Sequence, residues 1–452
     1  MSSELNPIFI ANLRSALDEE ASGRYLQALE NEPAAVSVRR NPFKMTQKEF
    51  AGHFAGLDAG QVPWCADGLY LKERPQFHLD PLVHAGAYYV QDAASMVVQQ
   101  VFAELRGQQP VRVLDLCAAP GGKSTCIAAE SMREGDILVS NEVIRSRATI
   151  LAENMTKWGR ADVVVTNDEP RRFAGLEGYF DLLLADVPCS GEGMFRKDDG
   201  SIGQWSPDNV ALCAARQRKI VAEAWPSLKT GGILIYSTCT FNRFENDGNV
   251  EWIARELGAE LLRLEVAPEA LATACGLQFI PGTTRSEGLY IAALRKTAAA
   301  SAARLRPART PARMVCNYAT DAECFKVSTA SGDIIKAYPA GLAAEIMALE
   351  GKLNVIRSGV AVASVKGRDL IPTAAIALSG KHAEKTFPCE MLSAGDALKY
   401  LRLEPLVFAD APKGFLLLKY EGVPLGFVKN LGARTNNLFP SAWRIRSTEV
   451  IE

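Results

Sequence analysis

Residues 111–123 read Val-Arg-Val-Leu-Asp-Leu-Cys-Ala-Ala-Pro-Gly-Gly-Lys, an apolar run followed at once by a turn of small residues. The run 111–116 predicts a buried strand, and residues 122–132 predict a helix directly after the turn. Small residues let a ligand approach the backbone, and a helix start offers unpaired N–H groups to a carboxylate. The stretch therefore predicts an α/β fold with a ligand site at the turn.

The same alternation of apolar runs and helical segments continues beyond this stretch. The predicted strands are 137–141, 162–166, 180–185 and 233–236, and the predicted helices between them are 145–158 and 207–228. Such alternation is typical of a doubly wound parallel sheet. The run at 289–294 predicts a last edge strand, so that residues 79–297 form one domain.

Four other segments flank this domain. Residues 1–78 show apolar side chains at helical spacing and a short strand, which predicts a mainly helical N-terminal module. Residues 298–315 predict a basic linker, because the Ala/Arg/Pro-rich stretch from Arg295 to Arg313 holds six basic residues and no acidic one. Segments 316–385 and 386–452 predict two small mixed α/β domains.

Composition narrows the class of protein. The chain has 452 residues, of which 48% are hydrophobic and 23% charged, with a formal net charge of −2. No apolar run is long enough to cross a membrane, and the first residues lack the features of a signal peptide. Ten cysteines without an export signal predict reduced thiols in a cytoplasmic protein. Because there is no CxxC pair, no metal site is expected.

Two cysteines follow predicted strands in a way that chemistry can use. Cys189 ends Asp-Val-Pro-Cys after the strand at 180–185, and Cys239 follows the strand at 233–236. In an open α/β sheet, ligands bind outside the carboxyl ends of the strands, so both thiols are expected in one site. A thiolate is a strong covalent nucleophile. With the turn at 117–123, the pair favours a methyltransferase that attacks its target covalently.

Seven of the other eight cysteines are expected to pack as small hydrophobic side chains. They are Cys117, Cys126, Cys213, Cys275, Cys316, Cys324 and Cys389.

Two acids end the neighbouring predicted strands. Glu142 follows 137–141, where a carboxylate typically binds ribose hydroxyls, and Asp168 follows 162–166, where it can meet an adenine edge. Two other cofactor motifs do not fit. GGKST lacks the first glycine of a P-loop because Cys117 stands there, and no GxGxxG is present.

These residues resemble the Sun/Fmu family of RNA cytosine-5 methyltransferases, and the resemblance covers nearly the whole chain. The motifs that carry it are VSVRRNPFK (36–44), PWCADGLYL (63–71), GAYYVQDAASM (86–96), LDLCAAPGGKST (114–125), DVPCSGEGMFRKD (186–198) and YSTCTFNRFEN (236–246). The length and the C-terminal extension resemble the RsmF-type members, which modify bacterial 16S ribosomal RNA. Val187 departs from the usual alanine, and Asp247-Gly248 departs after Glu245-Asn246, but neither change removes a reactive group.

The resemblance implies a class I S-adenosylmethionine-dependent methyltransferase, with a Rossmann-like doubly wound sheet and a C-terminal PUA-like RNA-binding region. Cys239 is implied as the nucleophile and Cys189 as the group that assists product release, while Lys123 and Asp186 would also face the target base. The implied cofactor-binding residues are Cys117, Ala118, Ala119, Pro120, Gly121, Gly122, Lys123, Glu142, Asp168 and Asp186.

The N-terminal module and the C-terminal domains would bind RNA around a cytosine that is flipped out of its base stack. Phosphate contacts are expected from Arg39, Arg40, Lys44 and the basic residues near the end of the chain. That end interleaves basic with aromatic side chains, a pattern that suits RNA and equally suits a small barrel core with charges facing water. The residues concerned are Lys429, Arg434, Arg444 and Arg446, with Phe427, Phe439 and Trp443.

The expected reaction is methylation of carbon 5 of cytosine in 16S ribosomal RNA within the 30S subunit, by a monomer without a membrane or metal partner. Transfer RNA remains an alternative substrate, because relatives share the same core. A non-catalytic ribosome-assembly factor that retains the fold is an alternative of a different class.

Overall fold

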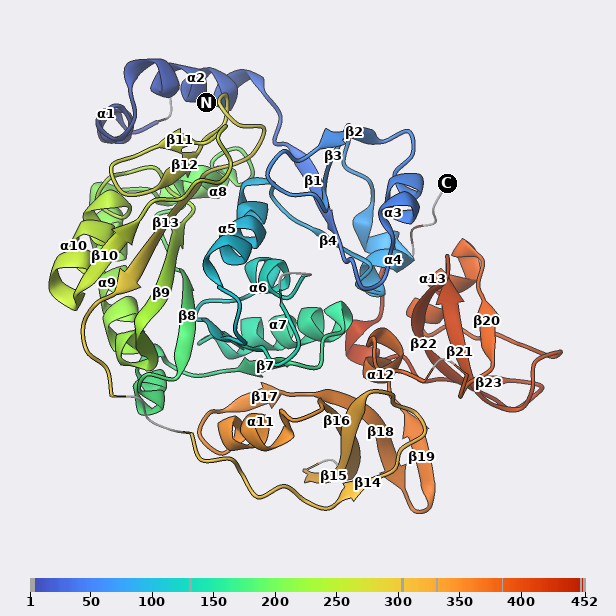
Figure 1. Cartoon of the computed structure of the whole chain (residues 1–452). Helices are drawn as coiled ribbons and strands as arrows, with labels where there is room; N and C mark the ends of the chain where they lie inside the picture. The colour runs from blue at the N-terminus through green and yellow to red at the C-terminus, as the bar shows by residue number, and fades with distance from the viewer. Residues whose placement is uncertain are drawn as a thin grey trace.

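The computed structural model describes residues 5–129, 132–301, 305–330, 332–383, 385–447 and 449. Within this part of the chain, ten strands form a central sheet (Figure 1). They are β5 (Arg112–Asp115), β6 (Ile137–Asn141), β7 (Val163–Thr166), β8 (Phe180–Asp186), β9 (Leu228–Thr238), β10 (Ala259–Leu262), β11 (Leu271–Ala272), β12 (Leu277–Phe279), β13 (Leu289–Lys296) and β17 (Val355–Arg357). Their order is β11-β12-β13-β9-β8-β5-β6-β7-β17, with β10 paired to β13.

The middle of this sheet confirms the predicted parallel α/β arrangement. β5 pairs in parallel with β6 on one side and with β8 on the other. The chain runs outward through β6 and β7 and then returns to β8, so the strand order reverses between β5 and β8. Ligands bind at such a reversal, outside the carboxyl ends of the strands. The turn after β5 and the cysteine motif after β8 both lie there.

Helices cover both faces of the sheet, because successive apolar side chains of a strand point to opposite faces and both faces must be buried. Val113 and Leu182 face one helical layer, while Leu114 and Leu183 face the other. The first layer contains α5 (Val97–Leu105), α6 (Gly122–Ile127) and α7 (Arg145–Trp158), and the second contains α9 (Pro207–Ala224), α10 (Asp247–Leu257) and α11 (Ala343–Glu350).

Two predicted elements differ from the structure. The helix expected at 122–132 ends at Ile127. The strand at 289–294 is present as β13, but it is not at an edge, because β9 pairs with one side of it and β12 and β10 pair with the other. The short segments that form β10 and β12 give little apolar pattern in the sequence.

The N-terminal segment begins with the expected helices and continues as an antiparallel sheet that helical spacing did not indicate. Its sheet order is β2-β3-β1-β4, and β4 pairs with β1 across the expected boundary at residue 78. The elements are α1 (Pro7–Ala16), α2 (Glu19–Asn31), β1 (Val36–Arg40), α3 (Gln47–His53), β2 (Asp58–Gln61), β3 (Gly68–Leu71), α4 (Pro81–His84) and β4 (Tyr88–Val90).

Two further sheets follow the central one, as the mixed composition of the C-terminal half predicts. The first has the order β14-β15-β16-β18-β19 and the second β20-β21-β22-β23. Their strands are β14 (Arg313–Met314), β15 (Ala322–Thr329), β16 (Gly332–Pro339), β18 (Val360–Lys366), β19 (Asp369–Pro372), β20 (Cys389–Met391), β21 (Gly414–Tyr420), β22 (Val423–Asn430) and β23 (Thr435–Asn437), with the helices α12 (Ala374–Leu378) and α13 (Ala394–Leu401).

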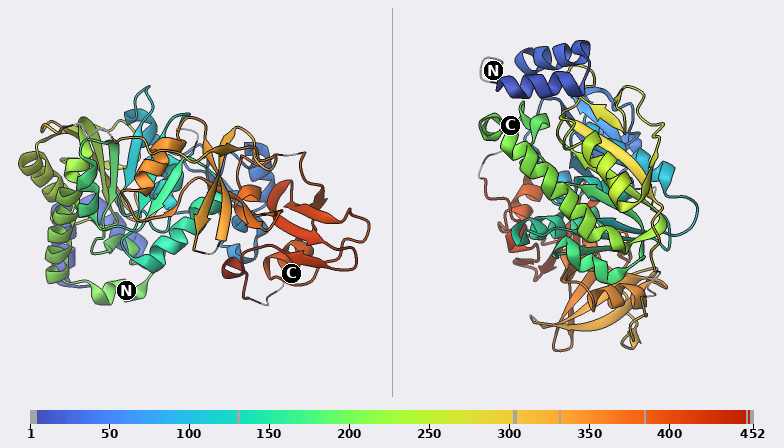
Figure 2. Two further views of the ribbon diagram at one scale, coloured as in Figure 1. Left: turned by 90° about the horizontal axis from the view of Figure 1, so that it is seen from below. Right: turned by 90° about the vertical axis from the view of Figure 1, so that its left-hand side faces the viewer.

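Contacts between distant parts of the chain unite these segments. The N-terminal sheet and the last sheet lie side by side and share one apolar core, in which Val38 and Tyr88 pack with Leu398 and Leu416 (Figure 1). The right-hand view of Figure 2 shows α1 and α2 at one end of the molecule and the sheet that begins with β14 at the other. None of the helices in the described ranges is long and apolar enough to cross a membrane.

Candidate active site

The two motif cysteines meet at the carboxyl ends of β8 and β9. These strands pair in parallel, with Asp186 opposite Ser237, so the residues that follow leave the sheet side by side. The Cys189 Sγ lies 2.8 Å from the Cys239 Sγ. The backbone N–H of Cys239 also donates to the Cys189 sulfur over 3.3 Å. Both cysteine residues are partly exposed.

The surroundings favour the protonated form of Cys189. The contact with Cys239, burial, and the Glu245 carboxylate raise the pKa of Cys189 well above its usual value. Cys189 therefore stays protonated and can donate its S–H to the Cys239 sulfur. This arrangement stabilises negative charge on Cys239, which is the form a nucleophile needs.

Two buried glutamates fasten the cysteine loops to each other, and the sequence analysis missed both. Glu192, from the Cys189 loop, accepts the backbone N–H groups of Phe241 at 2.7 Å and Asn242 at 3.0 Å. Glu245, from the Cys239 loop, accepts the backbone N–H of Ser190 at 3.1 Å. Each carboxylate thus satisfies donors on the opposite loop, which fixes the distance between the sulfurs. The only sequence signal was an acid inside each cysteine motif.

A close backbone approach also holds the Cys189 loop. The Gly193 N–H donates to the Cys239 carbonyl over 2.9 Å. A Cβ at Gly193 would lie 2.6 Å from the Cα of Gly288, so only glycine fits there.

Lys123 and Asp186 form an ion pair at the strand reversal. The Lys123 Nζ lies 2.7 Å from one Asp186 oxygen, and the Ser237 hydroxyl donates to the other oxygen over 2.8 Å. Burial lowers the pKa of Lys123, but the Asp186 carboxylate more than offsets this effect, and the Cys239 sulfur adds to it. The net pKa is raised, so the lysine is an ammonium group beside both the carboxylate and the cysteines.

The turn after β5 is held from outside by α7. Gly121, at the start of α6, has φ of 116°, a left-handed conformation that favours glycine. The carbonyl of Ala119 accepts from Arg147 over 2.9 Å, and that of Pro120 accepts from Asn154 over 2.8 Å. These carbonyls are therefore tied to the helix, and the backbone of the turn is fixed before a ligand binds.

Acidic side chains end or follow four neighbouring strands around this turn. Asp115 and Asp186 lie on β5 and β8, and Glu142 and Asp168 follow β6 and β7. Asp115, which the sequence analysis did not single out, is fully buried, and its Oδ1 has no hydrogen-bond partner in the described ranges. Burial raises the pKa of Asp115 to about 7, although a hydrogen bond from Ser124 opposes this effect.

These residues fit S-adenosylmethionine, which carries an ammonium and a sulfonium charge together with an adenosine. The unpartnered buried oxygen of Asp115 and the carboxylates of Glu142, Asp168 and Asp186 provide acceptor oxygens at successive strand ends, which suits a cationic nucleoside. A group of three or more side chains that could hold a metal ion does not occur among the described residues.

Three basic residues expected at RNA phosphates instead form hydrogen bonds or ion pairs within the protein. The Arg39 side chain is fully buried and donates to the Gln91 and Thr125 side chains over 2.8 and 2.5 Å. It supports α6, the helix after the turn. Arg40 pairs with Asp67. Lys44 donates to two backbone carbonyls, and burial lowers its pKa to about 7. The sequence shows charge but not burial, which explains why this prediction was wrong.

Other predictions have mixed outcomes. Cys126, Cys213, Cys316 and Cys324 are buried as expected, Cys117 and Cys275 are partly exposed, and Cys389 is exposed, contrary to expectation, because its short strand β20 lies at a sheet edge. The aromatic residues Phe427 and Phe439 pack in the core, whereas Arg434, Arg444 and Arg446 are exposed. The barrel-core interpretation therefore holds for these two aromatic residues.

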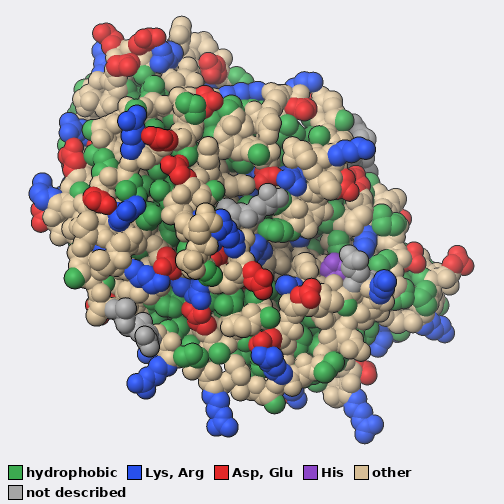
Figure 3. All heavy atoms as spheres, in the orientation of Figure 1, with side chains coloured by type: hydrophobic (Ala, Val, Ile, Leu, Met, Phe, Trp, Pro, Cys, Tyr) green, Lys and Arg blue, Asp and Glu red, His purple; other side chains and the backbone are tan. Residues whose placement is uncertain are grey.

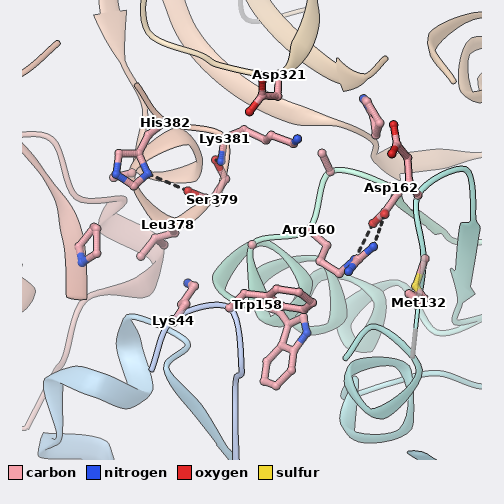
Figure 4. Close-up of a pocket in the computed structure, with 18 of the residues that line it drawn as sticks. Lys44, Met132, Trp158, Arg160, Asp162, Asp321, Leu378, Ser379, Lys381 and His382 are labelled. Atoms are coloured by element: carbon pink, nitrogen blue, oxygen red, sulfur yellow. Dashed lines mark hydrogen bonds and ion pairs between the residues drawn. The ribbon is translucent and has the colours of Figure 1, made fainter. Parts of the chain in front are cut away.

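A separate cavity of about 890 Å³ lies where the N-terminal segment, the central sheet and both C-terminal sheets meet. Figure 4 shows the Arg160–Asp162 ion pair on one side of it and the hydrogen bond between His382 and Ser379 on the other. Arg160 and Asp162 precede β7, at the amino end of the strand. The cavity therefore lies at the opposite end of β7 from Asp168 and is not the cysteine site.

The doubly wound sheet, the small-residue turn and the acids at successive strand ends define a class I S-adenosylmethionine-dependent methyltransferase. Residues 103–295 match the 16S rRNA methyltransferases RsmB/F. Residues 5–93 match the N-terminal domain of 16S rRNA methyltransferase RsmF, and residues 391–445 match the RsmF PUA domain.

Relatives with the same class of activity in their names align with almost the whole chain. Ribosomal RNA small subunit methyltransferase F of Klebsiella pneumoniae is 33% identical, with 96% of this chain and 95% of that protein covered. The protein of the same name from Escherichia coli O157:H7 is 32% identical with the same coverage. The chain belongs to the family of ribosomal RNA small subunit methyltransferase F.

Solved structures share the fold. A methyltransferase homologue from Pyrococcus horikoshii has a TM-score of 0.54 at 25% identity and covers 65% of this chain and 100% of its own. NSun6 from the same organism, solved with SFG, has a TM-score of 0.56 at 19% identity and covers 65% of this chain and 98% of its own.

Proposed function

We propose that this protein transfers a methyl group from S-adenosylmethionine to carbon 5 of a cytosine in 16S ribosomal RNA, through a covalent bond between Cys239 and the base. The observation that carries this proposal is the pair of sulfurs 2.8 Å apart at the strand reversal, with the Lys123–Asp186 ion pair beside them. The relatives named for the small ribosomal subunit support the choice of RNA.

Cys239 makes the base reactive. Carbon 5 of cytosine is a poor nucleophile while the ring is aromatic. When the Cys239 thiolate adds to carbon 6, the ring loses its aromaticity and carbon 5 becomes enamine-like. S-adenosylmethionine, when bound, supplies an electrophilic methyl group. Covalent attack thus divides one difficult step into easier ones.

Lys123 and Asp186 stabilise the negative charge that this attack places on the base. Addition at carbon 6 pushes electrons onto the ring nitrogen and the exocyclic amine. Because Lys123 keeps its proton beside Asp186, the ion pair can share a proton with the ring without a protonated aspartic acid in the resting enzyme. Ser237 holds the other oxygen of Asp186 and thereby orients the carboxylate.

Cys189 assists release of the product. After methylation, the carbon-5 proton leaves, the ring double bond re-forms and the Cys239 sulfur departs. Cys189 is a protonated thiol in contact with that sulfur, so it can give its proton to the leaving group. The two transfers occur together: carbon 5 gives its proton to the Cys189 sulfur while the double bond re-forms, and the departing Cys239 sulfur takes the Cys189 proton.

The acids at the strand ends would hold the methyl donor. The Glu142 carboxylate is almost fully buried and suits the ribose hydroxyls. Asp168 suits the adenine edge, and Asp115 and Asp186 suit the positive charges of the methionine part. The turn from Cys117 to Lys123 would pack against the donor through its backbone and the small side chains of Ala118, Ala119, Pro120, Gly121 and Gly122.

A groove beside the site suits a single RNA strand. It has a volume of about 1010 Å³ and runs between the N-terminal sheet and the loop after Cys189. Its lining mixes the exposed cations Lys72, Arg74, Lys197 and Arg285 with the acids Glu32, Glu73 and Asp92, and Lys197 pairs with Asp92. Figure 3 shows that positive and negative side chains are mixed over the face in view, so RNA recognition depends on local groups such as these rather than on a uniform field.

We also place the reaction in the cytoplasm, on the assembled 30S subunit, with the protein acting as a monomer that binds RNA through its N-terminal and C-terminal segments. Exposed Arg434, Arg444 and Arg446 near the chain end support the second contact. The test is transfer of labelled methyl groups to unmodified 30S subunits, naked 16S RNA and bulk tRNA in parallel, with light scattering for the oligomeric state. We expect label on carbon 5 of cytosine in 30S subunits. Label mainly on tRNA would overturn the substrate.

A further inference from the structure

Residues 343–357 belong to the methyl-donor half of the sheet, although the sequence places them beyond the linker. β17 pairs antiparallel with β7 and forms the edge of the central sheet. Arg357 secures the pairing, because its guanidinium donates to the carbonyls of Val163 and Arg160 over 2.7 Å each. On the same side, Ile346 and Leu349 of α11 pack into the core that lies under β5 and β8.

The loop before β17 reaches the acid at the end of β7. The backbone N–H of Asn354 donates to the Asp168 Oδ2 over 2.8 Å. The neighbouring residue is tied as well, since the Asn167 N–H donates to the Asn354 carbonyl over 3.0 Å and the Asn354 amide donates to the Asn167 carbonyl over 3.1 Å. The Asp168 backbone is held from inside the sheet by Asn141.

The second oxygen of Asp168 is left available. Oδ1 has no hydrogen bond from any residue in the described ranges, and the side chain is partly exposed. A carboxylate fixed through one oxygen presents the other in a defined direction. This oxygen can accept one hydrogen bond from an amino group such as that of adenine.

We propose that Asn354 is a positioning residue for the methyl donor: through its backbone N–H it orients Asp168 to accept the adenine amino group, so the segment after the linker completes the donor site. The proposal rests on the proposed function, because Asp168 is assigned to adenine there. It gives this segment a role besides RNA binding.

The same segment offers a matched control at the other end of the sheet. Glu345, on α11, forms a bidentate ion pair with Arg112 at the start of β5, with N–O distances of 2.6 and 2.7 Å. Glu345→Gln weakens the attachment of the segment far from Asp168. If Asn354 mattered only for attaching this segment to the sheet, substitutions at Asn354 and at Glu345 would have the same effect on binding of the methyl donor.

The test compares two ligands by calorimetry on the full-length protein, without any turnover. S-adenosylhomocysteine carries the adenine amino group, and S-inosylhomocysteine carries an oxygen in its place. We expect wild type to prefer the adenosyl ligand, and Asn354→Pro, which removes the N–H, to reduce this preference about tenfold. Asn354→Ala, which keeps the N–H, and Glu345→Gln should both retain the preference.

Two further measurements make the test decisive. Arg357→Met, which loosens β17 without altering Asn354, should also reduce the preference and serves if Asn354→Pro does not fold. In an Asp168→Ala background, Asn354→Pro should cause no additional loss. An unchanged ligand preference in both Asn354→Pro and Arg357→Met would overturn the inference. So would a loss of preference on Asn354→Pro that is equally large in the Asp168→Ala background. If wild type binds neither ligand, the proposed function fails instead.

Discussion

The Cys189 Sγ lies 2.8 Å from the Cys239 Sγ, although 50 residues separate the two cysteines in the chain. The parallel pairing of β8 with β9 creates this contact, and the reciprocal hydrogen bonds of Glu192 and Glu245 maintain it. The neighbouring sulfur and burial raise the pKa of Cys189, so this thiol is the member of the pair that keeps its proton.

Replacement of the nucleophile should stop the reaction without emptying the donor site. Cys239→Ala removes the atom that attacks carbon 6, so methyl transfer should fall at least a thousandfold. Calorimetry with S-adenosylhomocysteine should give an affinity within about threefold of wild type, because Cys239 is not one of the residues assigned to the donor site. Substantial remaining transfer would exclude Cys239 as the nucleophile.

Replacement of the second thiol should trap the covalent intermediate. In Cys189→Ala, addition and methylation can proceed, but the departing Cys239 sulfur lacks its proton donor. A protein–RNA adduct should therefore accumulate as a slow band on a denaturing gel. Cys389→Ala, which removes an exposed thiol elsewhere, is the control and should show no band. Normal turnover of Cys189→Ala without an adduct would contradict the release role.

Arg39 should matter for stability and for the donor site, not for RNA. Arg39→Met leaves the partners of a fully buried guanidinium unsatisfied, so the free energy of unfolding should fall by about 2–4 kcal/mol. Chemical denaturation measures this loss. The dependence of RNA affinity on salt concentration should have the same slope as in wild type.

Arg74 should show the opposite behaviour. It is exposed in the groove, so Arg74→Ala should leave stability within about 0.5 kcal/mol of wild type. If its guanidinium contacts a phosphate, the slope of log affinity against log salt should decrease by about 1. An unchanged slope would remove Arg74 from the RNA path.

Asp115 should make stability depend on pH. Its pKa is raised to about 7 in the folded protein from an ordinary value of 3.8, so between these values the folded state binds the extra proton. Stability should therefore fall as pH rises from about 4 to 7, by at most about 1.4 kcal/mol per pH unit. Asp115→Asn cannot lose a proton, so its stability relative to wild type should increase over this range. A constant difference in unfolding free energy would contradict the shifted pKa.

Local patterns predicted much of this molecule. The apolar runs that became β5, β6, β8 and β9 are continuous because both faces of a parallel sheet are buried, and such runs are visible in a sequence. The positions of Cys189 and Cys239 follow from those runs, since each cysteine lies just beyond a strand end. In contrast, β10, β12 and β17 are three or four residues long and carry too little pattern to be recognised.

What the sequence alone determined is the chemistry: a turn of small residues, acids at strand ends and two cysteines on neighbouring strands, because the carboxyl ends of parallel strands share one edge. Only the tertiary structure decided which charges face water and which segments meet. Arg39, Arg40 and Lys44 resemble an RNA contact in sequence. In the structure Arg39 is fully buried and Lys44 is half-buried, because their side chains bind Thr125 and Lys157, which lie about a hundred residues away. The contact between Asn354 and Asp168 arises in the same way, from a strand that joins a sheet formed nearly two hundred residues earlier.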